Sequence, residues 1–92
     1  MKVKIKYTAQ LKLAVGLSEE ISEINEGTLV KDLLNTLFQQ RKEALVNIVF
    51  SAEGDFLNAV LIILNGQQIG FDYPDALNED DEIIIMSPIA GG

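Results

Sequence analysis

The feature that most constrains the fold is one broad apolar stripe with helical spacing near the middle of the chain. It is formed by two parallel rows of side chains at four-residue steps, Leu29, Leu33 and Leu37 in one and Val30, Leu34 and Phe38 in the other. Thr28 precedes the stripe and is a residue type typical of a helix N-cap, so a helix is predicted from about Leu29 to Arg41. A chain of 92 residues supports one domain, and its principal helix must bury this stripe against a sheet.

Short segments with strand patterning lie on both sides of this helix. The predicted strands are residues 2–7, 18–24, 57–64, 67–69 and 82–86. In the first strand Val3, Ile5 and Tyr7 alternate with lysines, which indicates either a solvated face or an edge guarded against aggregation. In the last strand three consecutive isoleucines predict burial on both faces. The predicted fold class is α+β, with a mixed sheet of about five strands packed on one principal helix.

The connections between these elements carry their own signals. Asn65-Gly66 joins two strand patterns and predicts a tight hairpin with positive φ at both residues. Residues 9–15 fit a short helical turn that ends at Gly16, and residues 42–50 fit a second short helix or an extension of the first. Residues 51–55 are expected to form a loop, and residues 70–81 a polar connection with an apolar anchor at Ala76 and Leu77. We therefore expect one domain over residues 1–86 and an extended tail over residues 87–92.

The composition excludes several classes of function. Fourteen acidic against seven basic residues give a formal net charge of −7, which disfavours nucleic-acid binding and favours a basic protein partner. The chain has no Cys and no His, so it lacks a disulfide scaffold, a zinc–thiolate site and the commonest general base. We expect no metal site and no self-contained hydrolytic chemistry. The longest strictly apolar run, residues 59–64, is far shorter than the ~20 residues of a membrane span, so a cytoplasmic protein without membrane contact is expected.

The C-terminal sequence Pro88-Ile89-Ala90-Gly91-Gly92 is the most distinctive motif. Glycine lacks a Cβ, so the backbone of such a tail can approach another surface closely and thread a narrow channel. Six extended residues from position 87 reach roughly 20 Å, enough to place the terminal carboxylate inside a partner's pocket. That carboxylate is ionised at neutral pH and resists nucleophiles unless it is activated, for example as an acyl-adenylate. The chain has no glycine-rich phosphate-binding loop, so another protein must supply the activation.

The sequence resembles a known family, the ubiquitin-like sulfur carriers. This family includes the small subunit of molybdopterin synthase and has the β-grasp fold. The resemblance covers nearly the whole chain and rests on four stretches. The first two are Tyr-Thr-Ala-Gln-Leu-Lys at residues 7–12, followed by Val15-Gly16, and Gly-Thr-Leu-Val-Lys-Asp-Leu-Leu at residues 27–34. The other two are Leu64-Asn65-Gly66 and the ending, in which Asp-Asp-Glu-Ile at residues 80–83 leads to Ser-Pro-Ile-Ala-Gly-Gly at residues 87–92. The ending is its specific part.

The chain also departs from the family pattern at several positions. Lys12 stands where the family often has Arg, and Leu13 where it often has Glu. Asp80 replaces the usual turn glycine, and Ser87 replaces the first proline of the ending. The fold that the resemblance implies is a ubiquitin-like β-grasp with a flexible Gly-Gly tail.

The resemblance implies a mechanism and a set of partners. A ubiquitin-activating-like enzyme would use ATP to adenylate the carboxylate of Gly92, and a persulfide donor would convert it to a thiocarboxylate. The tail residues Pro88, Ile89, Ala90 and Gly91 would then insert into the large subunit of molybdopterin synthase, where sulfur passes to a pterin precursor. In this scheme the chain binds no cofactor of its own, donates sulfur as a subunit of the complex, and is not catalytic alone.

Other functions remain open at this stage. A ubiquitin-like modifier shares the tail and the adenylation step but ends as an amide on a target lysine. A carrier for tRNA thiolation or thiazole synthesis would use the same thiocarboxylate, although the ending and the length favour the molybdopterin branch. A plain interaction module with an incidental tail would not need the two glycines.

Two further surface features are candidate partner contacts. The acidic run at residues 79–82, with Asp80 and Asp81 at its centre, is either a solvated loop or a docking patch for a basic partner. Phe71 and Tyr73, near Ile69, either form an apolar anchor beside the tail or close one end of the core.

Overall fold

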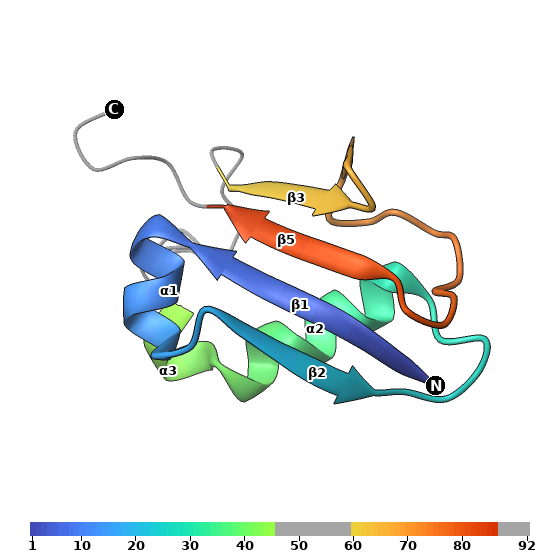
Figure 1. Ribbon diagram of the computed structural model, residues 1–92, viewed down its shortest axis with the longest axis horizontal. Helices are drawn as coiled ribbons and strands as arrows, with labels where there is room; N and C mark the ends of the chain where they lie inside the picture. The colour runs from blue at the N-terminus through green and yellow to red at the C-terminus, as the bar shows by residue number, and fades with distance from the viewer. Residues whose placement is uncertain (46–59, 87–92) are drawn as a thin grey trace.

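A five-stranded mixed sheet with one long helix across one face forms the body of the protein (Figure 1). The structure is a computed structural model and describes residues 1–45 and 60–86. The strands are β1 (Lys2–Thr8), β2 (Glu19–Glu23), β3 (Leu61–Leu64), β4 (Gln67–Ile69) and β5 (Glu82–Met86), and the helices are α1 (Ala9–Val15), α2 (Val30–Gln40) and α3 (Lys42–Leu45). The strand order is β2-β1-β5-β3-β4, with β1 and β5 parallel and the other pairs antiparallel. The predicted fold class is confirmed.

The apolar stripe of α2 makes the core with the inner face of the sheet. From α2, Val30, Leu33, Leu34, Leu37 and Phe38 are buried. From the sheet and its connections, the other buried apolar side chains among the described residues are Val3, Ile5, Tyr7, Leu11, Val60, Ile62, Leu77, Ile83 and Ile85. Side chains at helical spacing on α2 and side chains at alternate positions of the strands thus pack into one core. The central prediction from the sequence, that one helix covers one face of a sheet, is confirmed.

The predicted N-cap of α2 is wrong in its detail. Leu29, with an extended backbone, occupies the N-cap position, and no side chain caps the helix. The hydroxyl of Thr28 instead donates to the carbonyl oxygen of Asn25 at 2.7 Å and closes the preceding turn. The N–H group of Val30, the first residue of the helix, has no acceptor within the helix and donates instead to the carbonyl oxygen of Asp75 at 2.9 Å. A long-range backbone partner therefore replaces the local side-chain cap.

The lysine face of β1 is the solvated face of a central strand, because β1 lies between β2 and β5. The alternative expectation, a guarded edge, is wrong. Lys6 forms an ion pair with Glu82 at 3.3 Å across the open face. The same face exposes part of Ile84, whereas Ile83 and Ile85 have no exposed surface. Among the described residues, α2 covers only one face of the sheet. The expectation that β5 is buried on both faces is therefore wrong for this part of the chain.

The turns follow the sequence closely. Asn65 and Gly66 have φ of 50° and 86°, as a two-residue hairpin between β3 and β4 requires. Helix α1 ends at Gly16, which has φ of 85° and donates its N–H to the carbonyl of Lys12. In the connection before β5, Leu77 is buried as predicted, while Ala76 is exposed and forms an isolated bridge with Leu29.

Some predicted boundaries reach beyond the described residues. Strand β3 is described from Leu61 to Leu64, and Val60 before it is buried outside the strand. The predicted helix over residues 42–50 is described only as α3, and its remainder, the loop at 51–55 and the start of the predicted strand lie outside the described residues. Within residues 1–45 and 60–86, no helix is long and apolar enough to cross a membrane.

Candidate functional site

The candidate site begins where β5 ends, because the predicted reactive tail follows this strand directly. Met86 is the last residue of β5 and pairs with Thr8 of β1 on one side and with Leu61 of β3 on the other. The hydroxyl of Thr8 also lies 3.5 Å from the carbonyl oxygen of Ile85. A strand held by neighbours on both sides gives the tail a fixed point of departure. The tail residues Ser87 to Gly92, including Pro88, Ile89, Ala90 and Gly91, lie outside the described residues, so their role stays a prediction.

Exposed apolar side chains lie near this point of departure. Leu61, the partner of Met86, is 37% exposed, and Leu17, which precedes β2, is 41% exposed. Ser18, next to Leu17, accepts a hydrogen bond from the backbone of Tyr7, one residue before Thr8. Leu13 of α1 is 83% exposed. Sequence reasoning did not single out these leucines, and for Leu13 the only signal was its departure from the family pattern.

Phe71 lies at the same end of the sheet as Met86. Its ring stacks on that of Phe38 with centroids 5.5 Å apart and an interplanar angle of 11°. It is half-buried and lines a groove of about 480 Å³ together with Val60 and Leu61. Tyr73 also packs partly against the core, and a hydrogen bond to the Asp75 carboxylate raises the pKa of its hydroxyl. Phe71 therefore closes one end of the core while keeping an exposed side, and its partner contact stays a prediction.

The acidic run lies at the opposite end of β5 from the tail. Asp81 precedes the strand and Met86 ends it, a distance of about 17 Å at the usual rise of a strand. Closeness in sequence thus does not bring Asp80 and Asp81 close to the tail's point of departure. Asp80 is exposed and has φ of 67°, the left-handed conformation that the glycine usual at this position adopts without strain.

Asp81 is engaged in the fold rather than presented to solvent. Its residue is 8% exposed, and its two carboxylate oxygens accept hydrogen bonds from the side-chain amide of Asn65 at 2.8 Å and from the backbone N–H of Asn78 at 2.7 Å. The side-chain carbonyl of Asn65 in turn accepts from the N–H of Glu82 at 2.9 Å. This clamp fixes the hairpin turn to the start of β5. Of the two predicted contact residues, only Asp80 offers an exposed carboxylate.

We expect Asp81→Ala to lower the free energy of unfolding by about 2–4 kcal/mol, because two charge-assisted hydrogen bonds are lost and their donors are left without this acceptor. Urea denaturation would measure the change. Glu26→Ala, which removes the same charge from an exposed turn, is the matched control and should change stability by less than about 0.5 kcal/mol. Equal effects of the two variants would contradict the structural role of Asp81.

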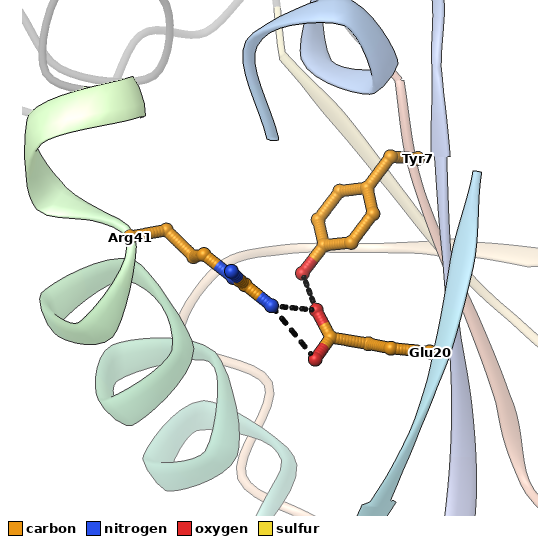
Figure 2. A network of polar contacts seen from close by, with 3 residues as sticks. All are labelled: Tyr7, Glu20 and Arg41. Atoms are coloured by element: carbon orange, nitrogen blue, oxygen red, sulfur yellow. Dashed lines mark hydrogen bonds and ion pairs between the residues drawn. The ribbon is translucent and has the colours of Figure 1, made fainter. Parts of the chain in front are cut away.

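A second polar cluster ties the far edge of the sheet to the end of α2. Figure 2 shows Tyr7 from β1, Glu20 from β2 and Arg41 after α2 pointing toward one another. The hydroxyl of Tyr7 donates to Glu20 Oε2 at 2.6 Å, and the guanidinium of Arg41 donates to both carboxylate oxygens at 3.0 and 2.9 Å. Burial, with the Glu20 hydrogen bond next in weight, raises the pKa of Tyr7 well above its ordinary value of 10.0. The Glu20 carboxylate also raises the pKa of Arg41.

This cluster does not form a reaction centre, since its three groups satisfy one another. Across residues 1–45 and 60–86, no group of three or more His, Cys, Asp or Glu side chains is placed to hold a metal ion. The described structure therefore supplies a folded body in which β5 ends between β1 and β3.

A mixed five-stranded sheet in this order, packed on one principal helix, defines the class of ubiquitin-like β-grasp proteins. Residues 5–92 match the ThiS family, and the chain belongs to that family. The molybdopterin synthase sulfur carrier subunit of Chlamydomonas reinhardtii is 25% identical to it over 92 residues, which cover 100% of both chains. The family and this relative place the chain among the ubiquitin-like sulfur carriers.

Solved structures agree with this fold. The crystal structure of SAMP1 from Haloferax volcanii is similar with a TM-score of 0.82 and 23% identity, and the match covers 100% of both chains. A chain in the protein–protein complex of subunits 1 and 2 of molybdopterin-converting factor from Helicobacter pylori 26695 is similar with a TM-score of 0.64 and 23% identity, again over 100% of both chains. These likenesses establish the fold.

Proposed function

We propose that this chain is the sulfur carrier subunit of a molybdopterin synthase. An adenylating enzyme joins the carboxylate of Gly92 to AMP, taken from ATP, and releases pyrophosphate. The terminal sulfur of a persulfide then attacks the acyl carbon and AMP leaves. An external thiol then attacks the donor sulfur of the resulting acyl disulfide, which releases the thiocarboxylate of Gly92 and leaves the donor as a mixed disulfide. A second thiol reduces this mixed disulfide, so that the donor returns as a thiol and the two external thiols leave joined as a disulfide. The thiocarboxylate finally donates its sulfur to a pterin precursor.

The observation that carries this proposal is the similarity to the molybdopterin synthase sulfur carrier subunit over the full length of both chains. The match to the ThiS family extends through residue 92 and so includes the Gly-Gly motif. The geometry supports the same role, because β5 ends between two strands and holds the start of the tail. The Helicobacter complex of subunits 1 and 2 supports a large subunit as the partner that receives the tail.

Conjugation to proteins is the second candidate function. It is favoured by the similarity of the fold to SAMP1, other solved structures of which are named small archaeal modifier protein 1. A modifier would use the same adenylate but would transfer the acyl group of Gly92 to a lysine amine, with loss of AMP or of a thiol. The two functions therefore differ in the fate of the activated carboxyl group.

The mass of the intact chain distinguishes the two functions. We would incubate the protein with an active adenylating enzyme of this family, ATP and a persulfide source, and measure its mass. The proposal predicts a shift equal to the replacement of one oxygen by sulfur, followed by loss of that sulfur when the large synthase subunit and the pterin precursor are added. Larger species with a Gly-Gly remnant on lysine, without the sulfur shift, would instead assign the chain as a modifier.

A further inference from the structure

Strand β2 is an edge strand of the sheet that the structure describes, and every second residue of it directs backbone hydrogen-bonding groups away from β1. It pairs with β1 on one side, and the structure describes no strand on its other side (Figure 1). Tyr7 donates to the carbonyl of Ser18, and Ile24 donates to the carbonyl of Met1. In an antiparallel ladder the bonded positions alternate, so the backbone groups of residues 18, 20, 22 and 24 face β1. Those of Glu19, Ile21 and Glu23 consequently face outward.

A groove runs beside this edge, between β2 and α2. Its volume is about 310 Å³, and it is lined mainly by polar side chains, among them Ser22 and Asn25 from the strand side and Asp32, Thr36 and Gln40 from the helix side. Glu20 also lines the groove and is held there by Tyr7 and Arg41. The edge thus offers both a backbone ladder and a place for side chains that point toward the helix.

The charges of this edge indicate what can pair with it. Glu19 and Glu23 are exposed on the open face on either side of Ile21, which is 56% exposed, and Glu23 and Asp32 border the groove. The ion pair of Glu23 with Lys2 is long, at 4.0 Å, and both side chains are largely solvated, so it neutralises little. The lysines of β1 lie one strand further in. A strand that brings basic side chains to this edge would therefore find complementary charge.

The same charges disfavour a second copy of the chain. An antiparallel pair of two β2 edges centred on Ile21 would place Glu19 of each copy opposite Glu23 of the other. Like charges directly opposite each other destabilise a strand pair. Charged edges of this kind are a known device against self-association.

We propose that the outer edge of β2 is a docking site for an extended basic segment of another protein, which adds to the sheet as a sixth strand. Backbone hydrogen bonds with Glu19, Ile21 and Glu23 would give affinity, and alternate side chains would give selectivity. The pattern that fits is basic–apolar–basic at every second residue on the open face, with small polar residues directed into the groove. Strand β1 separates this site from β5, the strand that the Gly-Gly tail follows in sequence, so the site would add a second contact to a partner of net basic charge.

The test is an NMR titration of the isotope-labelled protein with the peptide Thr-Lys-Thr-Val-Thr-Lys-Thr, acetylated and amidated at its ends. The expected shifts are confined to β2 and to the side of α2 that faces the groove. The same peptide with N-methyl groups on the amides that face β2 keeps every side chain and the charge but loses the ladder donors. It should therefore bind at least tenfold more weakly, since several hydrogen bonds are lost.

Two variants at one position isolate the protein's side of the ladder. Ile21→Pro and Ile21→Ala both remove the isoleucine side chain, but only proline removes the outward N–H. Proline is tolerated on an edge strand where the N–H faces solvent. We expect the proline variant to bind the peptide about three- to tenfold more weakly than the alanine variant, the effect of one hydrogen bond. Glu19→Gln, which keeps the backbone of the strand and removes a charge opposite one of the peptide lysines, should weaken binding as well and reduce its dependence on salt.

Several outcomes would overturn the proposal. Equal binding of the N-methylated peptide would reduce the contact to non-specific charge attraction. Shifts on the open face of the sheet, or none at millimolar peptide, would place the contact elsewhere or remove it. Line broadening that grows with protein concentration and maps to β2 would assign the edge to a second copy. Deleting Gly91 and Gly92 should leave peptide binding unchanged, which keeps this test independent of the proposed sulfur chemistry.

Discussion

A chain that lacks Gly92 is expected to fold normally and to accept no sulfur. The described core takes all its buried apolar side chains from residues 3–85, so removal of the last residue leaves this core intact. The carboxylate would then belong to Gly91 and would lie one residue, about 3.5 Å, short of its place in the partner. Misplacement by much less than this distance is costly in reactions that depend on alignment. The intact mass after incubation with the adenylating enzyme, ATP and persulfide should therefore show no sulfur.

Two matched variants make this prediction specific. Addition of one glycine after Gly92 keeps the flexibility and composition of the tail but moves the carboxylate outward, and it should abolish sulfur uptake as completely as the deletion. Ser87→Pro changes the start of the tail while keeping its end, and it should retain uptake. Thermal unfolding measured on all variants should give the same midpoint within about 2 °C. Sulfur uptake by the deleted or extended chain would refute the assignment of Gly92 as the acceptor.

The elements of the fold could be predicted where their signals are local. The stripe of α2 repeats within eleven residues, and the Asn65-Gly66 turn is specified by two neighbouring residues that tolerate positive φ. Both were predicted correctly. The cap of α2 was not, because its first N–H is satisfied by Asp75, far along the chain, and local preference cannot reveal such a partner.

The candidate site divides in the same way. The reactive tail could be proposed from the sequence alone, because the proposal rests on the residue types themselves, and its role stays a prediction. The surroundings could not, since they depend on which strands become neighbours. Asp81 belongs to an acidic run that predicts solvent exposure, yet its carboxylate accepts a hydrogen bond from the side-chain amide of Asn65 in the hairpin turn. The free edge of β2 follows from the strand order, which the pattern of individual strands does not specify.

The cluster of Tyr7, Glu20 and Arg41 is such a long-range arrangement, and its removal should have a large effect on stability. In Glu20→Ala the hydroxyl of Tyr7, a residue that is 2% exposed, loses its acceptor, and Arg41 loses both of its contacts to the carboxylate. An unsatisfied buried hydroxyl costs about 1–3 kcal/mol, and a partly exposed ion pair adds less than about 1 kcal/mol. We expect a total loss of about 1–4 kcal/mol in the free energy of unfolding, measured by urea denaturation.

The neighbouring position supplies the control for this variant. Glu19 is exposed and faces away from α2, so Glu19→Ala removes the same charge from the same strand without touching the cluster. Its effect should stay within about 0.5 kcal/mol. If the two variants were equally stable, the cluster would contribute nothing beyond the charge of β2.

The same cluster should make the protein sensitive to alkaline pH. The pKa of Tyr7 is raised in the folded state, chiefly by burial, so between its ordinary value of 10.0 and the raised value the folded chain keeps a proton that the unfolded chain has released. The contribution of this tyrosine to stability is thus complete below pH 10 and is lost as pH rises above it, by up to about 1.4 kcal/mol per pH unit. Tyr7→Phe should remove this part of the pH dependence, although it also loses the hydrogen bond to Glu20.

The measurement is the free energy of unfolding between pH 9 and 12 for the parent chain, Tyr7→Phe and Tyr73→Phe. The informative quantity is the difference between each variant and the parent, because contributions that all three chains share cancel in it. The curve of Tyr7→Phe should approach that of the parent as pH rises, because only the parent loses the contribution of Tyr7. Tyr73→Phe should change the slope much less, since the Tyr73 hydroxyl titrates at the surface, where its hydrogen bond to Asp75 competes with water. A constant difference between Tyr7→Phe and the parent across this range would show that Tyr7 titrates alike in both states, and would contradict its burial as the cause of the raised pKa.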